Sequence, residues 1–337
     1  MPTRFSVSRS TKLSRFANAA LIAVILALLL APWWSTRGVV GLLTEFLYFL
    51  ALAQLWNLLA GYAGVVSLGQ QAYIGLGGYT VFVLAGIWNT KPLVALLLAG
   101  IVGVCLAIPV AALVFRLRGA HLAIGTWVVA EVFRLGFSQI SALGAGSGKS
   151  LPVSVAQALD VQPLGREGLL YLIALILAIF SNVGSYWLLR SPQGLALTAI
   201  RDNEATARSC GVDSRRLRLM VFLGAALVTT LVGGLIFLTK FRISPSAAFD
   251  INWTSYVIFI VVIGGIGTLE GPLVGTALFF LLRESLAGFG AWYLIVLGCV
   301  AIVVMLKSPA GIWGAISRKY DISLFPIRRV LTVSQKG

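Results

Sequence analysis

Glu131 and Arg134 are charged residues within an otherwise apolar stretch, and they lie three positions apart. In a helix this spacing places both side chains on one face. If the stretch lies in lipid, such charges are stable only when they face protein, water or each other. The pair is therefore a candidate for the lining of a polar pathway. The structural alternative is an ion pair, with Arg134 extending toward the outer surface.

A second group of polar residues interrupts another apolar stretch. Its members have uncharged side chains that can donate or accept hydrogen bonds: Ser67, Gln70, Gln71 and Tyr73. Thr126, from the stretch that holds Glu131, has the same property. Glutamines in lipid-embedded helices face neighbouring helices or a wet cavity. Gly77 and Gly78 follow closely and permit tight packing of helices. The group predicts either a pathway lining or close packing by small and polar residues.

Other patterns argue against catalysis and metal binding. Residues 143–150 end like a phosphate-binding loop, but that motif needs glycine where Leu143 stands and a preceding strand. His121 is the only histidine, and the spacing of Cys105, Cys210 and Cys299 suggests neither a disulfide framework nor a metal site. No catalytic dyad or triad is recognisable. We expect no enzymatic activity, no ATPase site, and no metal or cofactor bound by this chain.

The composition identifies the solvent of these residues. Of the 337 residues, 59% are hydrophobic and only 11% are charged, and the mean hydropathy is +0.95. A water-soluble fold cannot bury so much apolar surface, because many residues of any fold remain exposed. The net charge of +15 therefore does not indicate nucleic-acid binding. The composition excludes a soluble enzyme and a disordered chain, and it indicates a protein of the lipid bilayer.

We predict an all-α, polytopic membrane helix bundle with about ten transmembrane helices. A bilayer core needs about 20 apolar residues per helix, and ten segments approach that length: 17–34, 42–60, 65–87, 93–115, 119–141, 169–189, 219–239, 254–268, 272–288 and 291–306. The first segment follows a basic leader and resembles a signal peptide. It ends in Pro32-Trp33-Trp34 and not in a small-residue cleavage site, so we expect a retained span.

The distribution of basic residues predicts the orientation. With both termini in the cytoplasm, 18 of the 26 Lys and Arg residues lie on the cytoplasmic side, as the positive-inside rule requires. The predicted organisation is a cytoplasmic N-terminal tail (1–16), a transmembrane domain (17–306) that includes a cytoplasmic loop (190–218), and a cytoplasmic C-terminal tail (307–337). We expect a multi-pass membrane protein, and the family resemblance described below implies the bacterial inner membrane.

The loop 190–218 has the features of a docking element. A helical stretch follows Pro192, and Gly211 is a natural C-terminal cap for it. The stretch carries alanines between charged residues, and small side chains let another protein approach closely. The alternative is an ordinary solvated loop. Elsewhere, Gly61-Tyr-Ala-Gly64 faintly echoes Gly264-Gly-Ile-Gly267, and each joins two apolar segments.

From about residue 45 to 315 the chain resembles the LivM-type permease subunits of bacterial branched-chain amino acid ABC transporters. Five motifs carry the resemblance: Gly61-Tyr-Ala-Gly64 with Ser67-Leu-Gly-Gln70, Arg116-Leu-Arg118-Gly119, Glu131-Val-Phe-Arg134, Ala199-Ile-Arg201-Asp202-Asn203-Glu204-Ala205 with Gly211, and Gly264-Gly-Ile-Gly267-Thr268-Leu-Glu270-Gly271-Pro272-Leu-Val-Gly275. The outer stretch Gly146-Ser-Gly-Lys149 departs from the Gly-Gly-Ser-Asp-Gly of relatives.

The resemblance implies a function and a set of partners. It implies a permease fold of the vitamin B12 importer type, a second LivH-like permease subunit, two cytoplasmic ATPases that use ATP and Mg, and a periplasmic substrate-binding protein. It also implies that one element couples the permease to an ATPase: Arg201, Asp202, Asn203, Glu204, Ala205, Ala207 and Gly211. Ser67, Gln70, Gln71, Tyr73, Thr126, Glu131 and Arg134 are the candidates for the translocation path.

Two other functions stay open at this stage. The same machine can carry urea, short amides or another small polar solute. An ion-coupled secondary transporter is an alternative of another class, and Glu131 is its main candidate for binding the ion. Such carriers usually need an unpaired intramembrane acid, and Arg134 is a neighbour that neutralises Glu131.

Overall fold

The computed structural model describes residues 4–8, 12–286, 288, 292–308, 310–320, 324–325 and 330–334, and most of these lie in helices. The helices run along the chain as follows: α1 (Lys12–Trp34), α2 (Arg37–Asn57), α3 (Gln70–Gly86), α4 (Pro92–Val114), α5 (Ala120–Ser138), α6 (Val153–Ala158), α7 (Gly165–Arg190), α8 (Pro192–Asp202), α9 (Glu204–Ser209), α10 (Ser214–Lys240), α11 (Pro245–Ala248), α12 (Ile251–Gly264), α13 (Gly271–Ser285), α14 (Trp292–Lys307) and α15 (Gly311–Tyr320).

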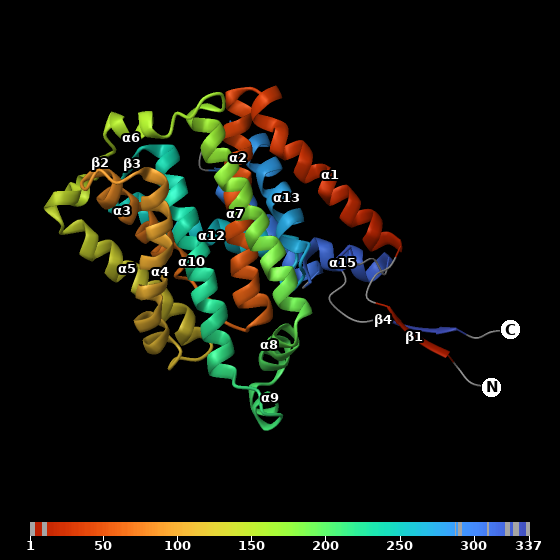
Figure 1. Cartoon of the computed structure of the whole chain (residues 1–337). Coiled ribbons are helices and arrows are strands. Elements are labelled where there is room, and N and C mark those ends of the chain that lie inside the picture. The colour runs from red at the N-terminus through yellow and green to blue at the C-terminus, as the bar shows by residue number, and fades with distance from the viewer. Residues whose placement is uncertain are drawn as a thin grey trace.

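Two short antiparallel strand pairs accompany the bundle. Strand β1 (Arg4–Ser8) pairs with β4 (Val330–Ser334), and β2 (Lys149–Ser150) pairs with β3 (Arg242–Ile243). In Figure 1, β2 and β3 lie at one end of the bundle, and α8 and α9 lie at the opposite end. Helices α1 and α5 form opposite flanks of that view.

Helix α10 is the centre of the bundle and packs against α3, α4, α7 and α2. Glycines permit the closest approach: a Cβ on Gly103 of α4 would overlap the Thr230 side chain of α10. Aromatic rings fill the space beside α3, where Tyr79 stacks on Phe137 and Phe249. Packing of small residues at helix crossings is typical of helices that associate in lipid.

Helix starts follow the local sequence. Pro92 occupies the first turn of α4, where its missing N–H leaves no intrahelical bond unmade. Asp213 accepts a hydrogen bond of 3.1 Å from the N–H of Arg216 and caps α10. Asp250 caps α12 in the same way, through the N–H of Asn252 at 2.9 Å. Side-chain acceptors at these positions satisfy N–H groups that a helix leaves unpaired.

Seven segments of the described residues are long and apolar enough to cross a membrane: Arg37–Tyr62, Pro92–Val114, Ala120–Ser138, Gly165–Arg190, Ser214–Lys240, Pro245–Gly264 and Ile295–Tyr320. The expected segments 65–87 and 272–288 form shorter helices, since α3 has 17 residues and α13 has 15. The expected segment 17–34 lies within α1, where Ala19–Trp34 form an apolar helical stretch. The chain is an all-α polytopic membrane bundle.

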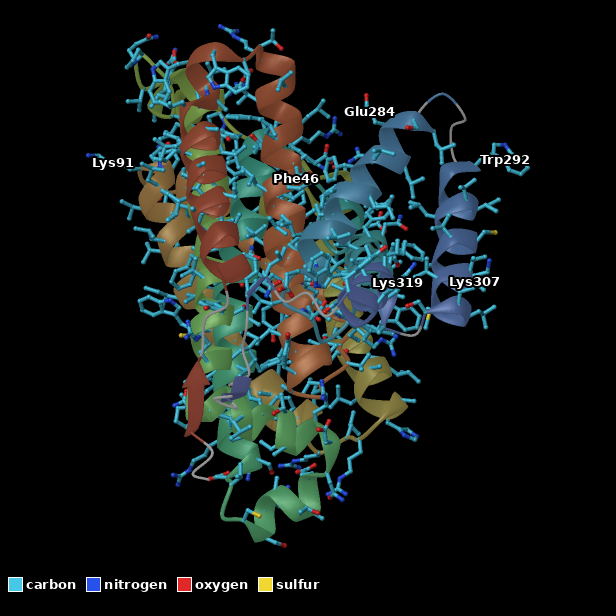
Figure 2. The ribbon with its side chains drawn as sticks, turned by 90° about the vertical axis from the view of Figure 1, so that its right-hand side faces the viewer. Phe46, Lys91, Glu284, Trp292, Lys307 and Lys319 are labelled. Atoms are coloured by element: carbon cyan, nitrogen blue, oxygen red, sulfur yellow. The ribbon has the colours of Figure 1, made fainter. Side chains whose placement is uncertain are left out.

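Two glycine-containing breaks explain the short helices. The loop before α3 contains Gly64, which has a φ of +68°. A second loop, between α12 and α13, contains Gly265, which has a φ of +135°. Both values lie where a Cβ is disfavoured. Figure 2 shows α14 at the edge of the bundle, with Trp292 and Lys307 at its two ends, and Lys91 near the end opposite to α8 and α9.

Candidate functional site

The loop 190–218, named here the coupling segment, folds into two helices and not into one helical stretch. Pro192 starts α8, and the Ser191 hydroxyl caps it by accepting from the N–H of Gly194 at 3.4 Å. Asn203 has an extended backbone, so it ends α8, and its side chain caps α9 through the N–H of Thr206 at 3.1 Å. Asparagine competes with helical hydrogen bonds in this way. Gly211, with a φ of +83°, ends the turn after α9.

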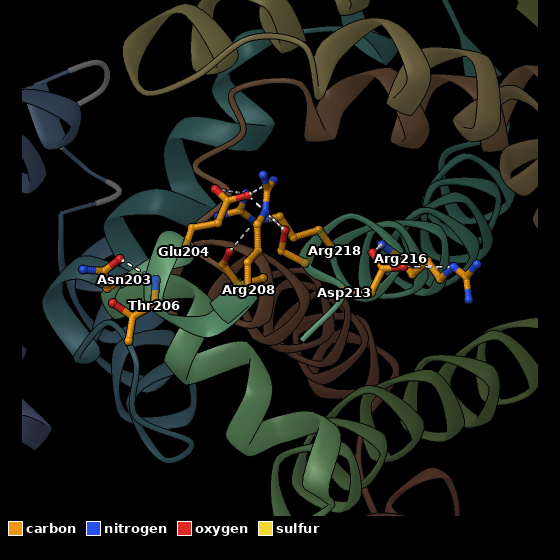
Figure 3. Close-up of polar contacts among 9 residues, drawn as sticks. Asn203, Glu204, Thr206, Arg208, Asp213, Arg216 and Arg218 are labelled. Carbon is orange, nitrogen blue, oxygen red and sulfur yellow. Dashed lines mark hydrogen bonds and ion pairs between the residues drawn. The ribbon is translucent and has the colours of Figure 1, made fainter. Parts of the chain in front are cut away.

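Glu204 anchors α9 to the start of α10. Its carboxylate accepts 2.9 Å from Arg218 and 3.0 Å from the hydroxyl of Ser214, and it forms an ion pair with Arg208 on the next turn (Figure 3). Burial alone raises the pKa of Glu204, but the hydrogen bonds and the two guanidinium charges outweigh it and hold the pKa below its ordinary value. The carboxylate is therefore ionised and fixed.

Arg201 connects the coupling segment to the end of α2. Its Nη1 atom donates 2.7 Å to the carbonyl oxygen of Gly61, and its Nε atom donates 2.9 Å to Asp202. Gly61 lies in a π-helical turn, Leu58–Tyr62, that continues α2. Nearby, Arg218 donates 3.3 Å to the carbonyl oxygen of Ala63. Charged donors thus hold two main-chain carbonyls between α2 and α3, and hydrogen bonds to charged groups are the stronger kind.

The same turn contacts the loop between α12 and α13. The Asn57 side chain accepts 2.8 Å from the N–H of Gly267 and donates 2.7 Å to the carbonyl oxygen of Thr268. A Cβ on Gly61 would lie 2.6 Å from the Gly267 nitrogen. Asn57, Gly61, Arg201 and Gly267 therefore form one junction, which we name the π-turn junction.

The remaining predicted residues of the coupling segment take different places. Asp202, Asn203, Ala205 and Gly211 are exposed, whereas Ala207 is buried. The exposed alanine and the exposed polar residues are accessible to a partner, while Ala207 packs on the buried side of α9. Arg201 and Glu204 face the body of the protein through the contacts described above.

Five of the predicted path residues are buried at or beside the start of α3: Ser67, Gln70, Gln71, Tyr73 and Thr126. Thr126 of α5 accepts 2.9 Å from the N–H of Leu68, and Gln70 donates 3.0 Å to the carbonyl oxygen of Leu52 in α2. Gln71 is hydrogen-bonded to Thr254 of α12. Trp56 donates 2.8 Å to the carbonyl oxygen of Ser67. Helices α2, α5 and α12 therefore meet at the polar start of α3.

Several buried polar atoms in this part of the bundle have no hydrogen-bond partner among the described residues. They are Nε2 and Oε1 of Gln54, Oε1 of Gln70, Nε2 of Gln71, and the hydroxyl of Tyr73. Buried polar groups are normally paired, so each such atom needs an explanation. Each of these atoms can still form a hydrogen bond with water or with a polar solute.

Glu131 and Arg134 lie apart from this buried group. They pair with each other, with 2.9 Å between Arg134 Nε and the carboxylate, and their side chains are 43% and 35% exposed. They share a face of α5, as their spacing predicts, and α5 is the least buried of the seven segments long enough to span a membrane. The structure therefore favours the ion-pair interpretation over a place beside Gln70 and Gln71.

Sequence reasoning missed Asn57 and Gln54. Both are fully buried amides of α2. A signal was present, because each interrupts the apolar segment 42–60 with a side chain that must find partners. Gly61 and Gly267, one from each of the two glycine motifs, approach each other closely across the junction.

The chain is similar to permease subunits of amino acid transport systems. Residues 38–305 match the family model described as branched-chain amino acid transport system / permease component. The high-affinity branched-chain amino acid transport system permease protein LivM of Escherichia coli K12 is 28% identical over 319 residues, which covers 87% of this chain and 74% of its own length. The corresponding LivM of Salmonella typhimurium LT2 has the same identity and coverage.

A more distant relative bears the name of a different subunit. The probable branched-chain amino acid transport permease protein LivH of Methanocaldococcus jannaschii is 24% identical over 289 residues, covering 80% of this chain and 87% of its own length. No solved structure matches the chain significantly. Because the family model spans most of the described bundle, the chain belongs to the branched-chain amino acid transport permease family.

Proposed function

We propose that this chain is the transmembrane permease subunit of an ABC importer that moves branched-chain amino acids across the inner membrane. The family match and the names of the relatives support the machine and its cargo. The match of residues 38–305 to the permease family carries the proposal. The bond from Arg201 to Gly61 supports a coupling role, because it attaches the coupling segment to the buried end of α2. The chain is a multi-pass membrane protein with seven span-forming segments among its described residues.

Ten crossings with both termini in the cytoplasm remain our proposal for the topology. Helices α3 and α13 are short, but each follows a loop that packs inside the bundle, so helix and loop together can traverse the bilayer. Residues 1–16 and 307–337 are then cytoplasmic tails. The vitamin B12 importer type of fold is proposed on the place of the coupling segment, between the sixth and seventh expected segments.

The coupling segment is proposed to dock on one cytoplasmic ATPase. Asp202, Asn203 and Ala205 present the exposed contact surface, and Gly211 ends it. Movement of this surface passes through Arg201 to the carbonyl oxygen of Gly61. From there the Asn57 side chain carries it to the loop between α12 and α13. The π-turn junction thereby links the docking surface to helices that line the buried polar group.

The translocation path is proposed to run beside Gln54, Gln70, Gln71 and Tyr73, whose unpaired atoms point to polar contents. Ser67 and Thr126 contribute at the start of α3. A branched-chain amino acid is a zwitterion without net charge, so neutral hydrogen-bonding groups suffice. Glu131 and Arg134 are proposed to line the path on the condition that a second permease subunit covers α5.

ATP and Mg belong to the partner ATPases in this proposal, and this chain supplies no ATPase site. A LivH-like permease subunit, two ATPases and a periplasmic binding protein complete the machine. The test is uptake of labelled leucine by vesicles that contain all these partners. Uptake must need both ATP and the binding protein. Uptake by this chain alone, driven by a proton gradient, would instead establish an ion-coupled carrier.

A further inference from the structure

A cavity of about 490 Å³ lies where the turn between α4 and α5 faces α9 and the start of α10. Its wall contains five arginines and one glutamate: Arg116, Arg118, Arg208, Arg215, Arg218 and Glu204. Gly64 and Val65, which precede α3, form its inner edge. The lining of this cavity does not include Gln54, Gln70, Gln71 or Tyr73 of the buried polar group.

The charges of this cavity are unbalanced. Glu204 neutralises part of the charge of Arg208 and Arg218, to which it is bound. Arg116, Arg118 and Arg215 have no carboxylate within ion-pair distance among the residues that the structure describes. Guanidinium groups gathered in one concave site repel one another and attract an anion. Their planar, forked donors match the oxygens of phosphate in particular.

The other wall of the cavity is apolar. It is formed by Ala112, Phe115, Leu117 and Leu122, which lie at the end of α4 and the start of α5. Beyond it, α5 presents exposed apolar residues such as Trp127, Val128 and Val132. A small inorganic anion gains nothing from an apolar wall, whereas an amphipathic anion buries hydrocarbon there.

We propose that the cavity binds the phosphate headgroup of an anionic phospholipid, whose acyl chains extend into the bilayer from the apolar wall at Phe115, Leu117 and Leu122. Basic pockets between transmembrane helices on the cytoplasmic side suit such headgroups. The leaflet assignment, and only that, rests on the proposed orientation with the coupling segment in the cytoplasm. Because Glu204, Arg208 and Arg218 belong both to the cavity and to the support of α9, a bound headgroup would stabilise the coupling segment.

The test measures lipid binding to the purified full chain by native mass spectrometry. The probes are phosphatidylglycerol, phosphatidylcholine and inorganic phosphate. We expect retention of phosphatidylglycerol at least about tenfold above that of phosphatidylcholine, because phosphatidylglycerol has a net negative charge and phosphatidylcholine has none. Each basic residue near an anionic lipid surface contributes about 1 kcal/mol. Equal retention of the two lipids would overturn the proposal. Competition by inorganic phosphate at equal concentration would assign a free-anion site and overturn the lipid assignment.

Variants locate the binding. R116Q/R118Q/R215Q removes the three arginines without a carboxylate partner and is expected to lose the preference for phosphatidylglycerol. The Lys versions of the same residues keep the charge and are expected to restore most of it. The matched control R37Q/K91Q/R242Q removes three exposed basic residues elsewhere and must retain the preference. If both triple Gln variants bind phosphatidylglycerol like the unmodified chain, the cavity is not the site.

This experiment separates two possible failures. It needs no transport and no partner subunit, so a failed uptake assay leaves its result standing. Conversely, loss of lipid binding in R116Q/R118Q/R215Q with uptake of leucine retained would support the lipid site and leave the transport proposal intact. An acidic segment of an ATPase is the competing occupant of the cavity. If the isolated chain prefers phosphatidylglycerol and R116Q/R118Q/R215Q loses this preference, the lipid occupies the cavity without an ATPase segment.

Discussion

The guanidinium of Arg201 donates a hydrogen bond of 2.7 Å to the carbonyl oxygen of Gly61, which lies 140 positions earlier in the chain. The acceptor is a main-chain atom of a π-helical turn, and Asn57, which directly precedes that turn, contacts the loop between α12 and α13. The bond therefore attaches α8 to the turn that continues α2.

Replacing Arg201 is expected to uncouple transport from ATP hydrolysis. In Arg201→Ala the bond to Gly61 is lost, and a hydrogen bond to a charged group contributes about 1.5–3 kcal/mol. Leucine uptake by the reconstituted importer should fall at least about tenfold while ATP hydrolysis persists. Arg216→Ala is the matched control, because Arg216 is highly exposed and its side chain pairs with Asp213. Normal uptake in Arg201→Ala would contradict the role of the junction.

Reversing the charge of Glu204 is expected to detach α9. Glu204→Lys places a cation against Arg208 and Arg218. The start of α10 then repels α9, which it binds in the unmodified chain. Uptake should be lost while the protein still inserts into the membrane at normal levels. Limited proteolysis should cut the coupling segment faster than in the unmodified chain. An unchanged cleavage rate would show that the ion pairs do not fix α9.

Acid should weaken the same contact. The pKa of Glu204 is lowered in the folded protein, so its contribution to stability is complete above the ordinary value of 4.5 and is lost as the pH falls through the folded pKa. Cleavage of the coupling segment should therefore accelerate below about pH 4.5 in the unmodified chain. Glu204→Gln should show this acceleration much less. Glu167→Gln, whose pairing with Arg166 spans 3.7 Å at the exposed start of α7, is the control.

A methyl group at position 61 should open the π-turn junction. The Cβ of Gly61→Ala would lie 2.6 Å from both the Asn57 side-chain oxygen and the Gly267 nitrogen, so one of them must move. Thermal unfolding in detergent should occur at a lower temperature, and uptake should fall as in Arg201→Ala. Gly38→Ala in the same α2 helix is the control, because open space surrounds it. An equal melting temperature for the two variants would argue against a tight junction.

The orientation can be tested with the chain's own cysteines, since all three are free and exposed. In the variant C105S/C299S only Cys210 of the coupling segment remains. A membrane-impermeant maleimide should label it in inside-out vesicles and leave it unmodified in intact cells. Adding Lys91→Cys in a chain that lacks all three native cysteines should give the reverse pattern. Labelling of Cys210 in intact cells would overturn the proposed orientation.

Sequence reasoning predicted the lipid environment, the helical class and the place of most apolar segments, because apolar runs in lipid have few alternatives to helix. It predicted one helical stretch after Pro192, but the structure breaks it at Asn203, whose side chain caps the next helix. It also placed a full span at 65–87, whereas α3 begins only at Gln70, after a loop in which Gly64 takes a left-handed backbone.

The assignment of the translocation path stays a prediction. Of the polar residues expected at the start of α3, Thr126 contacts this region through the N–H of Leu68, and Gln71 is hydrogen-bonded to Thr254. Glu131 and Arg134 do not join them, since spacing in sequence fixes a shared face but not the direction in which that face points. Asn57 was missed for a related reason: its partners lie more than 200 positions away, and only the folded chain brings them together.

Arg201 and Arg218 both bind main-chain oxygens, at Gly61 and Ala63. Every amino acid supplies the same carbonyl, so the receiving side of this attachment does not depend on side-chain chemistry. Substitutions should consequently be tolerated unequally on its two sides. The arginines are restricted by charge and reach, position 61 is restricted by size alone, and position 63 by the buried space around it. A saturation library scored for growth on limiting leucine would display this asymmetry directly.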